Sequence, residues 1–133
     1  MPVSMDWNNP EHTVILVTFD GVWESADIYR MINKGVSMLK SVNHPVDSIF
    51  DFTRSTFSPT NLLSAAEKME NDLQENNRLA VIVKANVYIR SIIKVAKIFA
   101  PRALENVHFV NTVEQAHNLI QKQSDQILTQ EVK

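Results

Sequence analysis

The residues best suited to chemistry lie at positions 51–63, DFTRSTFSPTNLL, where hydroxyl side chains crowd a short stretch. A hydroxyl beside a helix N-terminus is a suitable phosphate acceptor, because the unpaired N–H groups there carry partial positive charge. A nearby arginine can pair with the phosphate. We therefore consider a phosphorylation switch or partner-binding loop, whose candidate residues are Asp51, Arg54, Ser55, Ser58, Thr60 and Asn61.

The same stretch also has a structural interpretation. Serine is a favoured helix N-cap, and proline suits the first helical position, so Ser58 and Pro59 predict a helix start. Asp51 follows an apolar run, and ligands bind near the carboxyl ends of strands in open parallel sheets. A carboxylate in that place also accepts backbone N–H groups within its own loop. The sequence leaves both interpretations open.

Other kinds of catalytic or binding site are poorly represented. The chain has no cysteine and only two glycines, so thiol chemistry and glycine-rich phosphate-binding loops are not expected. No second carboxylate lies near Asp51, and no glycines surround the serines as in a nucleophile elbow. We therefore expect no catalytic residues, no metal site and no cofactor. None of the histidines has ligand spacing: His12, His44, His108 and His117.

One predicted helix carries an unusual charge pattern. Residues 76–104 contain six basic side chains and no acidic one. Arg90, Lys94 and Lys97 follow one another at steps of four and three, which places them on one helical face. That face is either solvated or a docking surface for an acidic protein. An anionic lipid head group is a weaker alternative, and nucleic acid is disfavoured because few aromatic residues interleave the basic ones.

Bulk properties indicate one soluble domain. The 133 residues are 44% hydrophobic and 21% charged, and the net charge of −2 selects no class of partner. The N-terminus lacks a basic and then apolar signal, and no apolar run approaches the roughly 20 residues of a membrane span. We therefore expect a cytoplasmic protein without a membrane span.

The hydrophobic pattern predicts alternating strands and helices. A short edge strand at 3–7 precedes strands at 13–19, 46–52, 79–85 and 107–110, and the pair Asp20-Gly21 ends or turns the second. Helices are expected at 24–41, 58–75 and 86–99, and a fourth begins after Thr112, which has capping-box spacing to Gln115. Residues 123–133 are polar and either extend the last helix or fray. The pattern predicts an α/β domain over residues 1–122, with four helices on a mostly parallel sheet of four or five strands.

This order resembles the STAS domains, the SpoIIAA-like anti-sigma-factor antagonists, over about residues 3–122. The resemblance is carried by VTFDGVWESADIYRMINKGVSML, by SIFDFTRSTFSPTNLL, and by RLAVIVKANVYIRSIIKVAKIF followed by VHFVNTVEQAHNLI. It implies the βαβαβαβα order of those domains, with an N-terminal edge strand.

The resemblance also implies a function. STAS domains of this type carry an Asp-Ser-Ser-Gly-Leu loop whose serine is phosphorylated by a partner kinase, which switches binding to a regulator. The matching residues here are Ser58, Pro59, Thr60, Asn61 and Leu62, so proline stands at the serine position unless the loop shifts to Ser58. We expect a non-enzymatic regulatory domain with a regulator or kinase-like protein partner. Binding of a small apolar or anionic ligand between the helices and the strand ends is the alternative, and a homodimer stays open.

Overall fold

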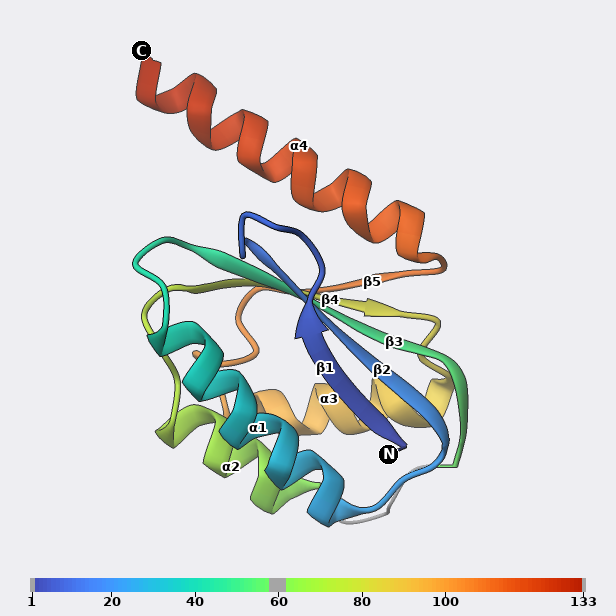
Figure 1. The fold of residues 1–133 in the computed structure, drawn as a ribbon. Helices are drawn as coiled ribbons and strands as arrows, with labels where there is room; N and C mark the ends of the chain where they lie inside the picture. Colours follow the sequence, from blue (N-terminus) through green and yellow to red (C-terminus); the bar gives the residue numbers. More distant parts are fainter. Residues whose placement is uncertain (1, 58–61, 133) are drawn as a thin grey trace.

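Five strands lie side by side in chain order and form one sheet, with helices on both faces (Figure 1). The computed structural model describes residues 2–57 and 62–132. The strands are β1 (Val3–Trp7), β2 (Val14–Val22), β3 (Val46–Phe57), β4 (Asn77–Val83) and β5 (Val107–Val110). The helices are α1 (Ser25–Lys40), α2 (Leu63–Asn71), α3 (Val87–Phe99) and α4 (Val113–Val132).

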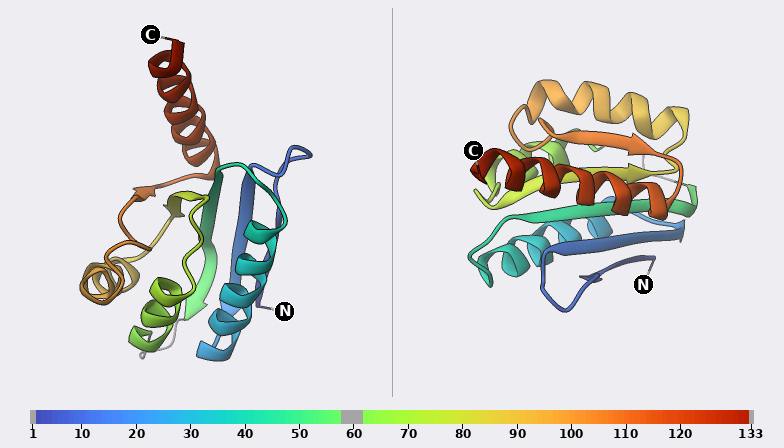
Figure 2. Two further views of the ribbon diagram at one scale, coloured as in Figure 1. Left: turned by 90° about the vertical axis from the view of Figure 1, so that its left-hand side faces the viewer. Right: turned by 90° about the horizontal axis from the view of Figure 1, so that it is seen from above.

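The topology decides which helix covers which face. Strand β1 is an antiparallel edge strand beside β2, whereas β2, β3, β4 and β5 run parallel. Each crossover adds the next strand on the same side, and right-handed crossovers then place their helices on one face. Figure 2 shows α1, α2 and α3 in a row on that face and α4 on the opposite one. This confirms the α/β fold class predicted from the sequence.

The core has a large layer beneath α1–α3 and a smaller one beneath α4. Phe19 and Trp23 are each 1% exposed and pack with Phe52 in the larger layer. Ala116 and Ile120 of α4 close the smaller layer over Ile49. Towards its carboxyl end α4 rises away from the sheet (Figure 1), so one helix covers only part of the second face.

Strands β2 and β3 extend beyond their predicted ends. The pair Asp20-Gly21 neither ends nor turns the strand, because Gly21 adopts a φ of +68° at a bulge and β2 continues to Val22. β3 continues to Phe57 beside it, with Ser55 opposite Gly21. The prediction that a loop follows residue 52 is therefore wrong for residues 53–57, which gain a strand partner that the local sequence does not reveal.

The helices agree with the predictions better at some ends than at others. α2 begins at Leu63 and ends at Asn71, within the predicted 58–75. The proposed start at Ser58-Pro59 lies outside the described residues. Asn86 caps α3 as predicted, accepting the Ile89 N–H at 2.8 Å. In α4, Thr112 accepts the Gln115 N–H at 3.0 Å, while the Gln115 side chain reaches the N–H of Asn111, and the polar segment continues the helix.

Candidate functional site

Two of the candidate loop residues, Arg54 and Ser55, lie on the extended part of β3. The Trp23 indole donates to Ser55 Oγ at 2.9 Å, so the hydroxyl holds the core tryptophan against the strand. Arg54 lies 3.7 Å from Asp20 on the neighbouring strand, and both side chains are exposed. Ser55 therefore has a structural partner, while Arg54 keeps its charge at the surface. The other candidates in this stretch, Ser58, Thr60 and Asn61, lie outside the described residues.

Asp51 lies within β3, between Thr18 and Val83 of its neighbouring strands. Its Oδ1 accepts the backbone N–H of Thr53 at 2.9 Å and the Thr53 hydroxyl at 2.5 Å. Asp51 therefore accepts hydrogen bonds from its own local segment, which agrees with the structural rather than the catalytic interpretation of this residue. The strand order does not reverse anywhere in this sheet, so no switch-point crevice of the kind that binds ligands in doubly wound folds lies beside Asp51.

The basic residues of α3 do not act alike. Arg90 lies 5.0 Å over the Phe109 ring and donates to the carbonyl of Ala85 at 3.2 Å, so it packs α3 onto β5. Lys94 and Lys97 are exposed. No hydrogen bond or ion pair joins either lysine to another residue in the described part of the chain.

The solvent side of α3 is unusually apolar. Among the described residues eight large apolar side chains are exposed, and five of them belong to this helix. Val87 is 80% exposed and Ile98 is 75% exposed. They lie at opposite ends of α3 but on the same helical face, and Lys94 lies between them on that face. We call this surface the α3 docking face: Val87, Tyr88, Val95, Ile98 and Phe99 with Lys94 and Lys97.

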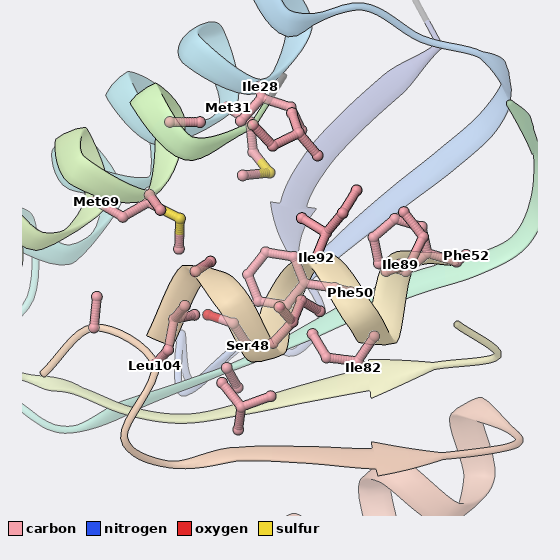
Figure 3. A pocket seen from close by; sticks show the side chains of 18 of the residues that line it. Ile28, Met31, Ser48, Phe50, Phe52, Met69, Ile82, Ile89, Ile92 and Leu104 are labelled. Carbon is pink, nitrogen blue, oxygen red and sulfur yellow. The ribbon is translucent and has the colours of Figure 1, made fainter. Parts of the chain in front are cut away.

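An apolar pocket lies between the sheet and α1–α3 (Figure 3). Its volume is about 140 Å³. Small side chains from three elements face one another there, and the space that larger ones would fill stays open. These are Ala65 and Ala66 of α2, Ala80 of β4 and Ala96 of α3. Phe50, although it lies on the central strand, is only half-buried, so the pocket is accessible from the surface.

The pocket wall is mainly hydrocarbon and aromatic, and Ser48 and Asn77 are the uncharged polar residues that line it. Ser48 of β3 is 8% exposed, and its side chain points from the sheet into the pocket beside Leu104 (Figure 3). No residue that the structure describes forms a hydrogen bond with this hydroxyl. The other labelled lining side chains are Ile28, Met31, Phe50, Phe52, Met69, Ile82, Ile89, Ile92 and Leu104. The sequence analysis gave a small-ligand site between the helices and the strand ends as an alternative, and it named none of these lining residues.

Two polar clusters that the sequence did not reveal hold the elements around the pocket. The buried Asp47 accepts Arg78 through both oxygens, at 2.8 and 2.6 Å. That hydrogen bond raises the pKa of Arg78. Glu70 of α2 accepts the N–H groups of Arg102 and Ala103 at 3.0 and 2.8 Å, which ties α2 to the segment between α3 and β5. The Ala103 N–H and the Arg102 side chain lower the pKa of Glu70.

Within residues 2–57 and 62–132, no group of three or more His, Cys, Asp or Glu side chains could hold a metal ion. No helix over the same residues is long and apolar enough to cross a bilayer.

The protein has the SpoIIAA-like fold, as comparison with solved structures shows. It superimposes on the anti-sigma-factor antagonist SpoIIAA in its unphosphorylated form with a TM-score of 0.64, at 10% identity, covering 90% of this chain and 97% of that one. An uncharacterised DUF3478-family protein with a SpoIIAA-like fold from Shewanella loihica gives a TM-score of 0.60 at 14% identity, covering 88% and 90%. No family model and no curated protein sequence matches the chain. The likeness confirms the fold expected from the sequence.

Proposed function

We propose that this chain is a non-enzymatic regulatory domain that binds an acidic protein partner through the α3 docking face. The observation that carries this proposal is the exposure of Val87 and Ile98 on the helical face of Lys94, a lysine without a hydrogen-bond or ion-pair partner among the described residues. Exposed apolar patches with a charged rim are typical of protein-interaction sites. The fold adds support, since the solved anti-sigma-factor antagonist SpoIIAA shares it.

The charge of the helix selects the partner. On α3 itself Arg90, Lys94 and Lys97 are basic and no residue is acidic, so the face attracts an acidic surface and repels a basic one. Lys94 and Lys97 would steer association, and the apolar side chains would supply most of the affinity once they are buried. The occupant we favour is thus an acidic regulator or kinase-like protein. A second copy of this chain is less well matched, because it would bring its own lysines to the contact.

A phosphorylation switch remains a separate prediction for residues 58–60. Ser55 is the least suitable acceptor in this region, because its hydroxyl holds Trp23. Intact-mass measurement of protein from native cells, followed by peptide mapping, tests whether Ser58 or Thr60 carries phosphate.

Affinity capture with paired variants tests the docking face. We expect Ile98→Glu, and separately Lys94→Glu combined with Lys97→Glu, to lose a partner that the wild type retains. Lys122→Glu on α4 changes an exposed lysine and should retain the partner. Retention by both α3 variants would contradict the proposal. A dimer that Ile98→Glu dissolves in light scattering would identify a second copy as the occupant and overturn the acidic-partner assignment.

The pocket favours ligand binding as a second candidate function. An apolar space of about 140 Å³ that reaches the surface is a plausible site for a small molecule. An apolar ligand fits this lining better than an anionic one, because no charged side chain lines the pocket. Thermal denaturation with and without small apolar molecules tests this function, since a ligand that binds only the folded state raises the melting temperature.

A further inference from the structure

The shape of the pocket indicates an elongated ligand. Ser48, Phe50 and Phe52 of β3 form the floor of the pocket. The four residue steps from Ser48 to Phe52 span about 13 Å of strand. At the Ser48 end, a second recess of about 80 Å³ continues beneath α1 and shares Met31, Ser48 and Phe50 with the first. A cavity near 150 Å³ accommodates about one benzene-sized molecule. A slender chain uses this length and volume better than a broad polycyclic molecule.

Ser48 places a hydroxyl at one end of the pocket floor, and Asn77 is the other uncharged polar residue of the lining. A serine hydroxyl donates one hydrogen bond and accepts others, so a hydroxyl that faces the open space of a pocket can bond to a ligand there. Ser48 is more than nine-tenths buried and lacks a side-chain partner among the described residues. Its position at one end of the floor leaves the apolar remainder of the pocket for the rest of the ligand. The site therefore matches one oxygen at the end of a hydrocarbon chain.

The pocket lining determines whether the oxygen-bearing group of the ligand is neutral or ionised. None of the residues that line the pocket, all of them in the described part of the chain, is Asp, Glu, Lys, Arg or His. The second recess adds one carboxylate, Asp72, which is paired with Lys68. Two arginines next to lining residues in the sequence are already paired, Arg78 with Asp47 and Arg102 with Glu70. An ionised head group would lose its hydration without a compensating charge. A neutral hydroxyl or carbonyl loses much less and regains a hydrogen bond from Ser48.

We infer that the pocket binds a neutral single-chain molecule with one terminal oxygen, of the class of medium-chain alcohols, aldehydes and ketones. The chain lies along Phe50 and Phe52, and the oxygen bonds to Ser48. This inference rests on the ligand-binding candidate function and is independent of partner docking on α3.

Calorimetric and thermal-shift titrations of the full chain with octan-1-ol test the inference. We expect saturable one-to-one binding and a rise in melting temperature. Sodium octanoate at pH 7.5 has the same chain length but a charged head, and should bind at least tenfold more weakly. Equal or tighter binding of octanoate would overturn the assignment of a neutral head group. If neither probe binds, ligand binding in this pocket is overturned altogether.

Three variants locate the bound molecule. Ser48→Ala should weaken octan-1-ol binding about tenfold, the loss of one hydrogen bond, while Ser64→Ala, an exposed serine on α2, should not. Ala96→Phe should abolish binding by filling the pocket, and circular dichroism checks its folding. Ala80→Val is a milder block that keeps the test valid if Ala96→Phe unfolds. Undiminished binding to Ser48→Ala overturns the bond to Ser48 alone, and undiminished binding to folded Ala80→Val or Ala96→Phe overturns the site.

Discussion

Asp47 and Arg78 form a buried two-pronged ion pair that joins β3 to β4, with Arg78 Nε and Nη2 donating to the two carboxylate oxygens at 2.8 and 2.6 Å. Asp47 is 2% exposed and also accepts the N–H of Leu79 at 3.0 Å. Arg78 donates further to Ser124 Oγ of α4 at 3.0 Å. The pair thus connects the sheet to the helix that covers its second face.

Removal of the carboxylate should strongly destabilise the fold. Asp47→Ala leaves the Arg78 guanidinium without its partner, and breaking a buried pair in this way costs about 3–5 kcal/mol. Urea denaturation measures the loss. Asp6→Ala removes the exposed pair with Lys34, at 3.6 Å, and should cost at most about 1 kcal/mol. Equal losses of stability from the two substitutions would show that the buried pair contributes no more to folding than the exposed pair does.

Ser55 should matter for stability through Trp23. Ser55→Ala leaves the indole N–H without its acceptor, which costs about 1–3 kcal/mol for a buried donor. Emission of Trp23 should shift, and a Trp7→Phe background isolates that signal. Thr56→Ala changes the exposed neighbour and serves as the control. An unchanged spectrum and stability in Ser55→Ala would mean that the hydrogen bond does not contribute.

Glu70 should make stability depend on acid pH. Its pKa is lowered from an ordinary value of 4.5, so the folded state binds the proton less readily than the unfolded state. The contribution of Glu70 is therefore complete above pH 4.5 and is lost as the pH falls through the lowered pKa. The stability difference between wild type and Glu70→Gln should stay constant from pH 7 to 5.5 and then shrink. Glu67→Gln, an exposed residue on the same helix, controls for the general effect of lost charge, and a difference that grows on acidification would contradict the assignment.

Partial filling of the pocket should stabilise the ligand-free protein. Ala80→Val adds a β-branched side chain that suits a strand and extends into the open space, and cavity-filling substitutions commonly add about 0.5–2 kcal/mol. Val81 is the neighbouring strand residue on the opposite face and is fully buried. Val81→Ile should lose about 1–3 kcal/mol by overpacking. Thermal melts compare the two, and a loss of stability in Ala80→Val would show that the pocket has no room to spare.

Local pattern was sufficient to predict most of the elements. The helix at α1 followed from apolar residues at three- and four-residue steps, and its start at Ser25 and end at Lys40 agree with the prediction to within one residue. Asn86 allowed the start of α3 to be predicted, because an N-cap hydrogen bond joins residues that are close in the sequence. The end of β3 could not be predicted in this way, since residues 53–57 become a strand only by pairing with residues 20–22 of β2.

The candidate sites depended on contacts between distant residues. Asp47 and Arg78 are 31 positions apart, and nothing in either local sequence indicates the pair. The spacing of Arg90 and Lys94 places both on the same helical face, so the sequence did not distinguish their roles. In the structure, Arg90 forms a cation–π contact with Phe109, whereas Lys94 is exposed to solvent. The pocket arises because alanines from α2, β4 and α3 meet. Alanines at positions 65, 66, 80 and 96 were visible in the sequence, but only the packing of three elements turns their small size into an open space.

The strand order has a consequence for how the chain folds. Each strand lies beside the one that precedes it in the sequence, from β1 at one edge to β5 at the other. Every new strand can therefore dock on an edge that has already formed as synthesis proceeds from the N-terminus, without waiting for a distant segment. We expect assembly to advance in one direction across the sheet, with β5 and α4 the last elements to be added.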